Sequence, residues 1–129
     1  MTFTGGTEVG RGIARIAAER LIPASLELGG KSPTIVLEDA DLDHAVNGVL
    51  YGIFGSSGQS CIAGSRLLVQ RSVQQDFVDR LVRRAGQLRM GDPADERTQL
   101  GPLISAAHRA SVEHHVIEAL AEGGKLLCG

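Results

Sequence analysis

Apolar side chains recur every three or four residues in three stretches of the chain, which is the spacing of a helix with one buried face. These stretches are 7–20, 39–54 and 72–88. In the first, the apolar stripe extends to Leu21, and Pro23 ends the helix because proline has no backbone N–H to donate. Ser72 is the predicted cap of the third helix. Its predicted buried stripe consists of Val73, Phe77, Leu81, Val82, Ala85 and Leu88. A fourth helix is predicted over 105–122, because two glycines follow it.

Short apolar runs between these helices predict strands. They occur at the start of the chain ("TFT") and in "ASLELGG", "PTIVLE", "SRLLVQ" and "KLLC". Residues 90–105 are rich in Gly, Pro and Asp and are predicted to form a loop. Strands that alternate with helices predict an α/β fold with a mostly parallel sheet and flanking helices. Because the first strand has no beginning and the last has barely begun, we expect a piece of a larger protein, truncated at both ends.

The composition and charge of the chain bear on which kinds of binding partner are expected. Hydrophobic residues make up 43% of the chain and charged residues 22%, as in soluble globular proteins. A net charge of −2 and only 3% aromatic residues give no reason to expect nucleic acid or a membrane as a partner. The first ten residues show no signal peptide and the two cysteines are expected to be free thiols, which predicts a cytoplasmic protein. No metal site is predicted, because the adjacent His114 and His115 point to different sides of a helix.

Residues 3–10, "FTGGTEVG", join a predicted strand to a predicted helix through a glycine turn. Backbone amides at the positive end of a helix, with no side chains in the way, bind anions such as a pyrophosphate. The stretch does not have the G-x-G-x-x-G spacing. On these residues alone, a plain tight turn is therefore favoured over an anion site.

Two further stretches carry reactive side chains. Glu27 lies between Leu26 and Leu28 in "LELGG", so in a strand it faces away from both, either as a solvent-facing glutamate or as a general base. Cys61 lies among Gly, Ser and Ala in "FGSSGQSCIAGSR", where small neighbours let a ligand or another backbone approach the sulfur. It is either a nucleophile or an inert cysteine in a tight turn. Cys128, in "KLLC", is expected to be inert and buried.

In this order, "FTGGTEVG", "LELGGKSP", "DADLD", "GQSCIAGSR", "GDPADERTQLGPLIS" and "EGGKLLCG" resemble the NAD(P)-dependent aldehyde dehydrogenase family. The resemblance covers essentially the whole chain. "LELGGKSP" and "GQSCIAGSR" are its most specific parts, and the separation of 34 residues between Glu27 and Cys61 (61 − 27) also fits the family.

The resemblance implies an enzyme that oxidises a small-molecule aldehyde to a carboxylic acid with NAD or NADP, through a thiohemiacetal and then a thioester on the cysteine. It implies that Cys61 is the nucleophile and Glu27 the general base. The cofactor contacts it implies are Gly5, Gly6 and Thr7 near the pyrophosphate, and Leu28 and Gly29 near the nicotinamide. It further implies that 1–28 is the tail of a Rossmann-like dinucleotide-binding domain and 29–129 the first half of the catalytic domain. Full-length members of the family are homo-oligomers.

The chain also departs from the family pattern. Gly6 stands where the family usually has Ser, Ser56 where it often has Asn, and Gly55 where an aromatic residue is common. Family members are much longer, and the Asn that completes their oxyanion hole lies outside these residues, so we expect the isolated chain not to turn over an aldehyde. Two alternatives are a CoA-acylating semialdehyde dehydrogenase, whose members typically lack the glutamate at the position of Glu27, and a non-catalytic remnant.

Overall fold

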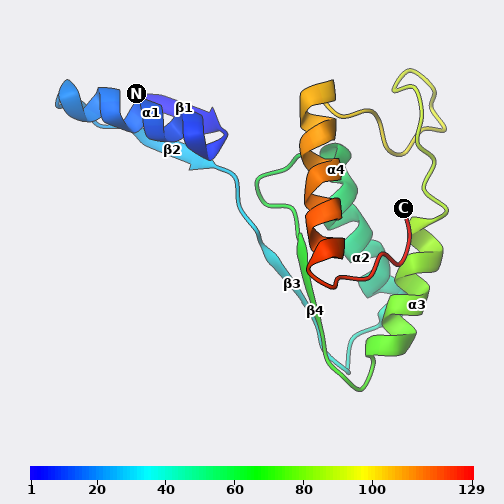
Figure 1. The fold of residues 1–129 in the computed structure, drawn as a ribbon. Coiled ribbons are helices and arrows are strands. Elements are labelled where there is room, and N and C mark those ends of the chain that lie inside the picture. Colours follow the sequence, from blue (N-terminus) through cyan, green and yellow to red (C-terminus); the bar gives the residue numbers. More distant parts are fainter.

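The chain folds into two parts that a short extended segment joins (Figure 1). The computed structural model describes residues 1–129. In chain order the elements are β1 (Thr2–Gly5), α1 (Thr7–Glu19), β2 (Ser25–Leu28), β3 (Pro33–Val36), α2 (Leu42–Phe54), the short 3₁₀ helix η1 (Gly55–Gly58), β4 (Arg66–Val69), α3 (Gln74–Ala85) and α4 (Ala106–Ala121). We call 1–28 the N-terminal part, 29–32 the linker and 33–129 the C-terminal part.

The N-terminal part is a parallel pair of strands joined by a helix. β1 and β2 pair in register from Thr2 with Ser25 to Gly5 with Leu28, and α1 is the crossover that a parallel pair requires. Gly10 of α1 is buried, and a Cβ added to it would lie 2.6 Å from Leu28 Cδ2. The missing side chain therefore lets α1 pack closely on β2.

The prediction that Leu21 continues the buried stripe of α1 is wrong. The helix ends at Glu19, and Leu21 follows with φ 53° and with 94% of its surface exposed. The Ile22 N–H donates to the Ala17 carbonyl at 3.0 Å and the Leu21 N–H to the Ala18 carbonyl at 3.1 Å. These two bonds form a Schellman motif, which requires a left-handed residue where glycine is preferred. A local capping motif therefore overrides the apolar periodicity.

The C-terminal part contains the main core. β3 and β4 pair in parallel from Pro33 with Arg66 to Val36 with Val69, and α2 packs against α3. The core cluster consists of Val36, Val46, Val49, Leu50 and Phe77. Phe77 is fully buried, which contributes about 2–3 kcal/mol. The predicted stripe of α3 is confirmed at Phe77, Leu81, Ala85 and Leu88, which all pack into or against this cluster.

Ser72 is not the cap of α3. The helix begins at Gln74, and Val73 precedes it without a side-chain cap. The Ser72 hydroxyl instead donates to Glu38 Oε2 at 2.8 Å, while Gln70 Oε1 accepts from the Glu38 N–H at 2.9 Å. The hydroxyl therefore ties the end of β4 to the end of β3 through a hydrogen bond to a charged acceptor.

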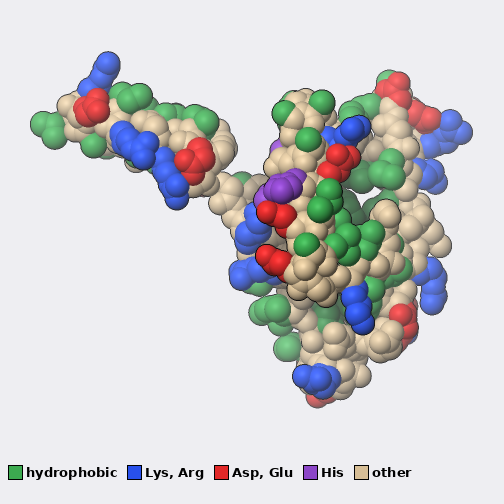
Figure 2. All heavy atoms as spheres, in the orientation of Figure 1, with side chains coloured by type: hydrophobic (Ala, Val, Ile, Leu, Met, Phe, Trp, Pro, Cys, Tyr) green, Lys and Arg blue, Asp and Glu red, His purple; other side chains and the backbone are tan.

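Helix α2 begins with a charged cap. Asp41 Oδ1 accepts from the His44 N–H at 3.0 Å, and this backbone hydrogen bond holds the pKa of Asp41 below its usual value. On the surface, Arg80 donates to Asp76 and to Asp43, which joins α3 to α2. Figure 2 shows charged side chains of both signs interspersed over the two parts.

The last third of the chain is a loop followed by one helix. Residues 90–105 form the predicted loop, and its only strand-like feature is an isolated bridge between Met90 and Leu100. Ser105 caps α4 by accepting from the His108 N–H at 3.1 Å. The predicted strand in "KLLC" is wrong, because this run pairs with neither of the two sheets. Cys128 is exposed rather than buried.

The α/β prediction and the parallel pairing of strands are confirmed, although the strands form two separate pairs rather than one sheet. None of the helices combines the length and the apolar character needed to cross a lipid bilayer.

Candidate functional site

A cavity of about 660 Å³ lies where the two parts of the chain meet. The carboxyl ends of β1 and β2, the linker, the cysteine loop (55–65) and the start of α4 contribute to its wall. The sequence-predicted site residues that line it are Gly5, Gly6, Glu27, Leu28, Gly29 and Cys61. Thr7 is not among the lining residues and is the first residue of α1, next to Gly6. The carboxyl ends of parallel strands are where open α/β folds bind their ligands.

Glu27 reaches the cavity because of the strand in which it lies. Along β2, Leu26 and Leu28 are half-buried while Glu27 is exposed, so the predicted alternation is confirmed. Its register partner is Thr4, and the next pair joins Gly5 to Leu28 at the end of both strands. The carboxylate is therefore held on a paired strand at the edge of the cavity.

The glycine turn presents bare backbone to the cavity. Gly6 is the N-cap of α1 with φ −70° and ψ 147°, and no side chain caps the helix there. A Cβ added at Gly6 would meet nothing within 4 Å. The first N–H groups of a helix have no partners within it and carry partial positive charge. The start of α1 therefore offers open, uncapped donors to an anion.

The cysteine loop begins with an unusual backbone. Ser56 and Ser57 have φ 54° and 55°, in the left-handed region that residues with side chains rarely adopt, and Gly58 follows with φ 73°. Such conformations cost about 1–3 kcal/mol each and persist where the surrounding structure fixes them. Cys61 follows this turn and is exposed, and its backbone N–H donates to no other group of the chain.

A small residue of the linker also shapes this loop. A Cβ added at Gly30 would lie 3.0 Å from the Cys61 carbonyl oxygen, so the linker backbone passes directly against that of the cysteine. The sequence predicts that small residues let another backbone approach here. A backbone does approach here, but it approaches the carbonyl and not the sulfur, and Gly30, which permits it, lies outside the cysteine loop.

Several lining residues were not predicted from the sequence as part of the site, among them Gln59, Ile104 and His108. Gln59 Oε1 accepts from the Ile104 N–H at 3.2 Å, which joins the cysteine loop to the segment before α4. The only local signal is that Gln59 lies two residues before the cysteine. The pairing spans 45 residues and no periodicity reveals it.

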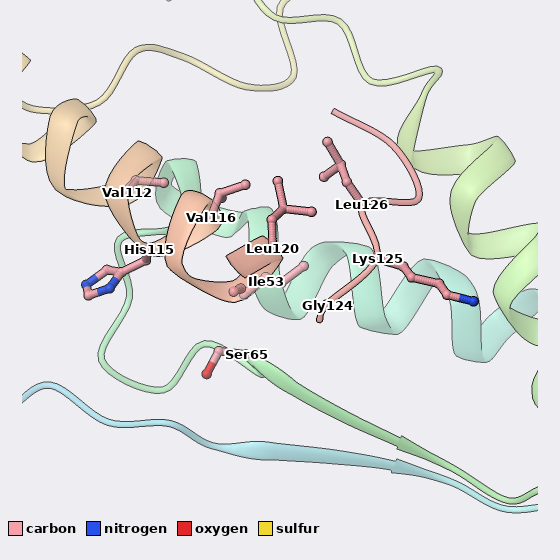
Figure 3. A pocket seen from close by; sticks show the side chains of 10 residues that line it. Ile53, Ser65, Val112, His115, Val116, Leu120, Gly124, Lys125 and Leu126 are labelled. Atoms are coloured by element: carbon pink, nitrogen blue, oxygen red, sulfur yellow. The ribbon is translucent and has the colours of Figure 1, made fainter. Parts of the chain in front are cut away.

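A second cavity, of about 610 Å³, lies away from these residues. Val112, Val116 and Leu120 of α4 face Ile53 of α2 and Leu126 across it (Figure 3). Figure 2 shows apolar side chains gathered beside α4 in the same region. Its wall contains neither Cys61 nor Glu27, so it is not the cavity of the predicted nucleophile and base.

The profile of the aldehyde dehydrogenase family matches residues 1–129, the full length of the chain. The chain belongs to the aldehyde dehydrogenase family. Betaine aldehyde dehydrogenase from Brucella ovis is 46% identical to this aldehyde dehydrogenase chain over 129 residues, which are 100% of this chain and 26% of the Brucella protein. The chain thus spans about a quarter of the length of the curated relatives that it matches.

Solved aldehyde dehydrogenases show the same fold. The NAD⁺ complex of aldehyde dehydrogenase from Bacillus cereus matches with a TM-score of 0.96 at 41% identity, over 99% of this chain and 26% of that one. HpcC from Thermus thermophilus matches with a TM-score of 0.96 at 45% identity, over 99% of this chain and 25% of that one. The two strand–helix parts described above are therefore arranged as in whole aldehyde dehydrogenases.

Proposed function

We propose that this family member oxidises an aldehyde to a carboxylic acid with NAD or NADP, with Cys61 as the nucleophile and Glu27 as the general base. The observation that carries the proposal is that these two residues, from different parts of the chain, line one cavity. A thiol and a carboxylate facing the same space are what a covalent mechanism with hydrolysis requires.

The first step is the attack of the Cys61 thiolate on the carbonyl carbon. A C–S bond forms, and the electron pair of the carbonyl π bond moves to the oxygen. The Cys61 backbone N–H has no partner in the chain and would donate to that oxyanion. The product of this step is a thiohemiacetal on the cysteine.

A bound nicotinamide cofactor would be the oxidant, so that the thiohemiacetal carbon could lose a hydride and leave a thioester on Cys61. Glu27 then accepts a proton from water as the water oxygen attacks the thioester carbon. The C–S bond breaks, the acid leaves and the Cys61 thiolate is restored. Because Glu27 is present, water rather than a second thiol is the expected acceptor of the acyl group.

The chain's own residues fit part of such a cofactor. The uncapped start of α1 and the open space at Gly6 suit a pyrophosphate, which needs N–H donors and room for its oxygens. Leu28 and Gly29 line the same cavity as this turn and Cys61, and they would contact the nicotinamide of a bound cofactor. A Cβ added at Gly29 would also meet nothing within 4 Å, so the backbone there is open to a ring.

We also propose that residues 1–28 belong to the dinucleotide-binding domain and 29–129 to the catalytic domain. The packing supports this division, because α1 contacts β1 and β2 while the core cluster begins at Val36. Cys61 and Glu27 would then lie on opposite sides of the domain boundary.

The experiment is acetylation by 4-nitrophenyl acetate, an activated ester that requires a nucleophile but no cofactor. The 129-residue chain is exposed briefly at neutral pH, and peptide mass spectrometry locates the acetyl groups. We expect acetylation of Cys61 to be much faster than that of Cys128, although both are exposed, and Cys61→Ser to abolish it. Equal acetylation of the two cysteines would overturn the proposal.

The role of Glu27 is tested on the same adduct. We expect Glu27→Gln to acetylate at the normal rate but to lose the acetyl group about a hundredfold more slowly, because a general base contributes at least that much. Glu19→Gln is the matched control, since Glu19 is exposed and lies outside the cavity. Loss of the adduct at the same rate in all three proteins would remove Glu27 from the mechanism.

A further inference from the structure

Gln59 makes the longest-range hydrogen bond of the cysteine loop. Its Oε1 accepts from the Ile104 N–H at 3.2 Å across 45 residues. The other hydrogen bonds within 55–63 are local: the Gln59 N–H to the Ser56 carbonyl, the Ala63 N–H to the Ser60 carbonyl and the Ile62 N–H to the Ser60 hydroxyl. One amide side chain thus connects this loop to the segment before α4.

The loop needs such a connection because its backbone is strained. Ser56 and Ser57 both hold left-handed φ angles, which persist only where neighbouring structure fixes them. The segment that carries Ile104 lies close by, since a Cβ added at Gly101 would be 3.6 Å from Ser57 Oγ. The hydrogen bond from Ile104 therefore reaches the loop between the strained turn and Cys61.

We propose that Gln59 is a positioning residue, which holds the Cys61 backbone N–H in the orientation needed to receive the oxyanion during acylation. Gln59 and Ile104 both line the cavity of Cys61, and Gln59 is only two residues from it. Without the amide oxygen of Gln59, the loop samples other conformations. In these the Cys61 thiol is still exposed, but the Cys61 backbone N–H no longer points to the oxyanion. This role rests on the proposed function, because it concerns the acylation step at Cys61.

Two reagents test the Cys61 thiol and the Cys61 backbone N–H separately. Iodoacetamide alkylates a thiolate by displacement of iodide and builds no oxyanion, whereas 4-nitrophenyl acetate forms an oxyanion at its carbonyl. In Gln59→Met, which keeps the length but has no acceptor, we expect acetylation of Cys61 to fall about fivefold or more, while alkylation is unchanged. Gln59→Asn, whose amide is too short to reach, is expected to behave in the same way and serves as a second variant if the first folds poorly.

Hydrogen exchange gives an independent measurement. Loss of the acceptor is expected to speed exchange at the Ile104 N–H about fivefold in both variants, and Gln59→Glu, which keeps an oxygen at the same reach, is expected to restore slow exchange. Cys128 is the internal reference for both reagents.

The outcomes separate the two proposals. If wild-type Cys61 acetylates no faster than Cys128, the proposed function fails and the positioning role fails with it. If wild-type acetylation is selective but Gln59→Met leaves it unchanged, the positioning role alone is overturned. An equal fall in acetylation and alkylation would also overturn it, because that result indicates general loosening of the loop rather than loss of oxyanion donation.

Discussion

Adding one methyl group to α1 should have opposite effects at two of its glycines, Gly10 and Gly12. A glycine-to-alanine change in the interior of a helix stabilises it by about 1 kcal/mol, because alanine has less backbone freedom to lose. At Gly12 the added Cβ would meet nothing within 4 Å, so Gly12→Ala should deliver this gain. At Gly10 the added Cβ would lie 2.6 Å from Leu28 Cδ2, 3.2 Å from Cδ1 and 3.5 Å from Cγ.

The contacts at Gly10 set the size of the loss. Carbon atoms pack best at about 3.5–4.0 Å, so either α1 must move outward by roughly 1 Å or Leu28 must change rotamer. Overpacking of this kind costs about 1–3 kcal/mol. With about 2 kcal/mol as the central value, about 1 kcal/mol of net destabilisation remains after the helix-propensity gain.

Native-state hydrogen exchange of α1 measures both changes, because it reports the local opening of the helix. We expect exchange of α1 amides to slow about fivefold in Gly12→Ala and to speed up about fivefold in Gly10→Ala. Adding Leu28→Ala to Gly10→Ala removes the clashing atoms, so the two changes should be strongly non-additive. If Gly10→Ala protected α1 as well as Gly12→Ala does, close packing of α1 on β2 through the bare Gly10 backbone would be refuted.

Two further predictions concern the ends of helices. Leu21→Gly should stabilise the N-terminal part by up to about 1 kcal/mol, because it relieves a left-handed leucine that is 94% exposed; faster exchange of α1 amides in this variant would contradict it. The pKa of Asp41 is lower in the folded chain than the 3.8 of an unfolded aspartate. The Asp41 carboxylate therefore contributes its full stability at pH values above 3.8. This contribution is lost as the pH falls through the lower pKa of the folded chain. Asp41→Asn keeps a capping acceptor that does not titrate. Over this acidic range, the helix signal of the variant in circular dichroism should therefore fall less than that of the wild type. Equal acid loss in the two proteins would show that the Asp41 cap does not contribute.

The features that the sequence predicted correctly are those that depend on short-range periodicity. The stripe of α3 around Phe77 follows from helical spacing, and the outward face of Glu27 follows from strand alternation. Both patterns are local, so they do not depend on where the rest of the chain lies. The family motifs added the proposed nucleophile and the proposed base to these elements.

What the sequence could not predict depends on partners far along the chain or on backbone angles. Ser72 had a helix to cap but bonds to Glu38, 34 residues away. The bond between Gln59 and Ile104 depends on how a loop of no regular structure folds back. The run at 125–128 has strand-like residues, yet a strand forms only where a neighbouring edge accepts it.

The linker gives the proposed chemistry a property that neither part of the chain has alone. One end is anchored, since Arg66 Nε donates to the Lys31 carbonyl at 2.7 Å and Gly30 lies against the Cys61 carbonyl. At the other end Gly29 stands in open space, next to the strand that carries Glu27. Rotation about Gly29 would therefore change the separation of Cys61 and Glu27 while the cysteine loop kept its contact with Gly30. In the proposed mechanism, a substitution at Gly29 would thus affect the release of the acyl group, which uses both residues, more than the attack that forms it, which uses Cys61.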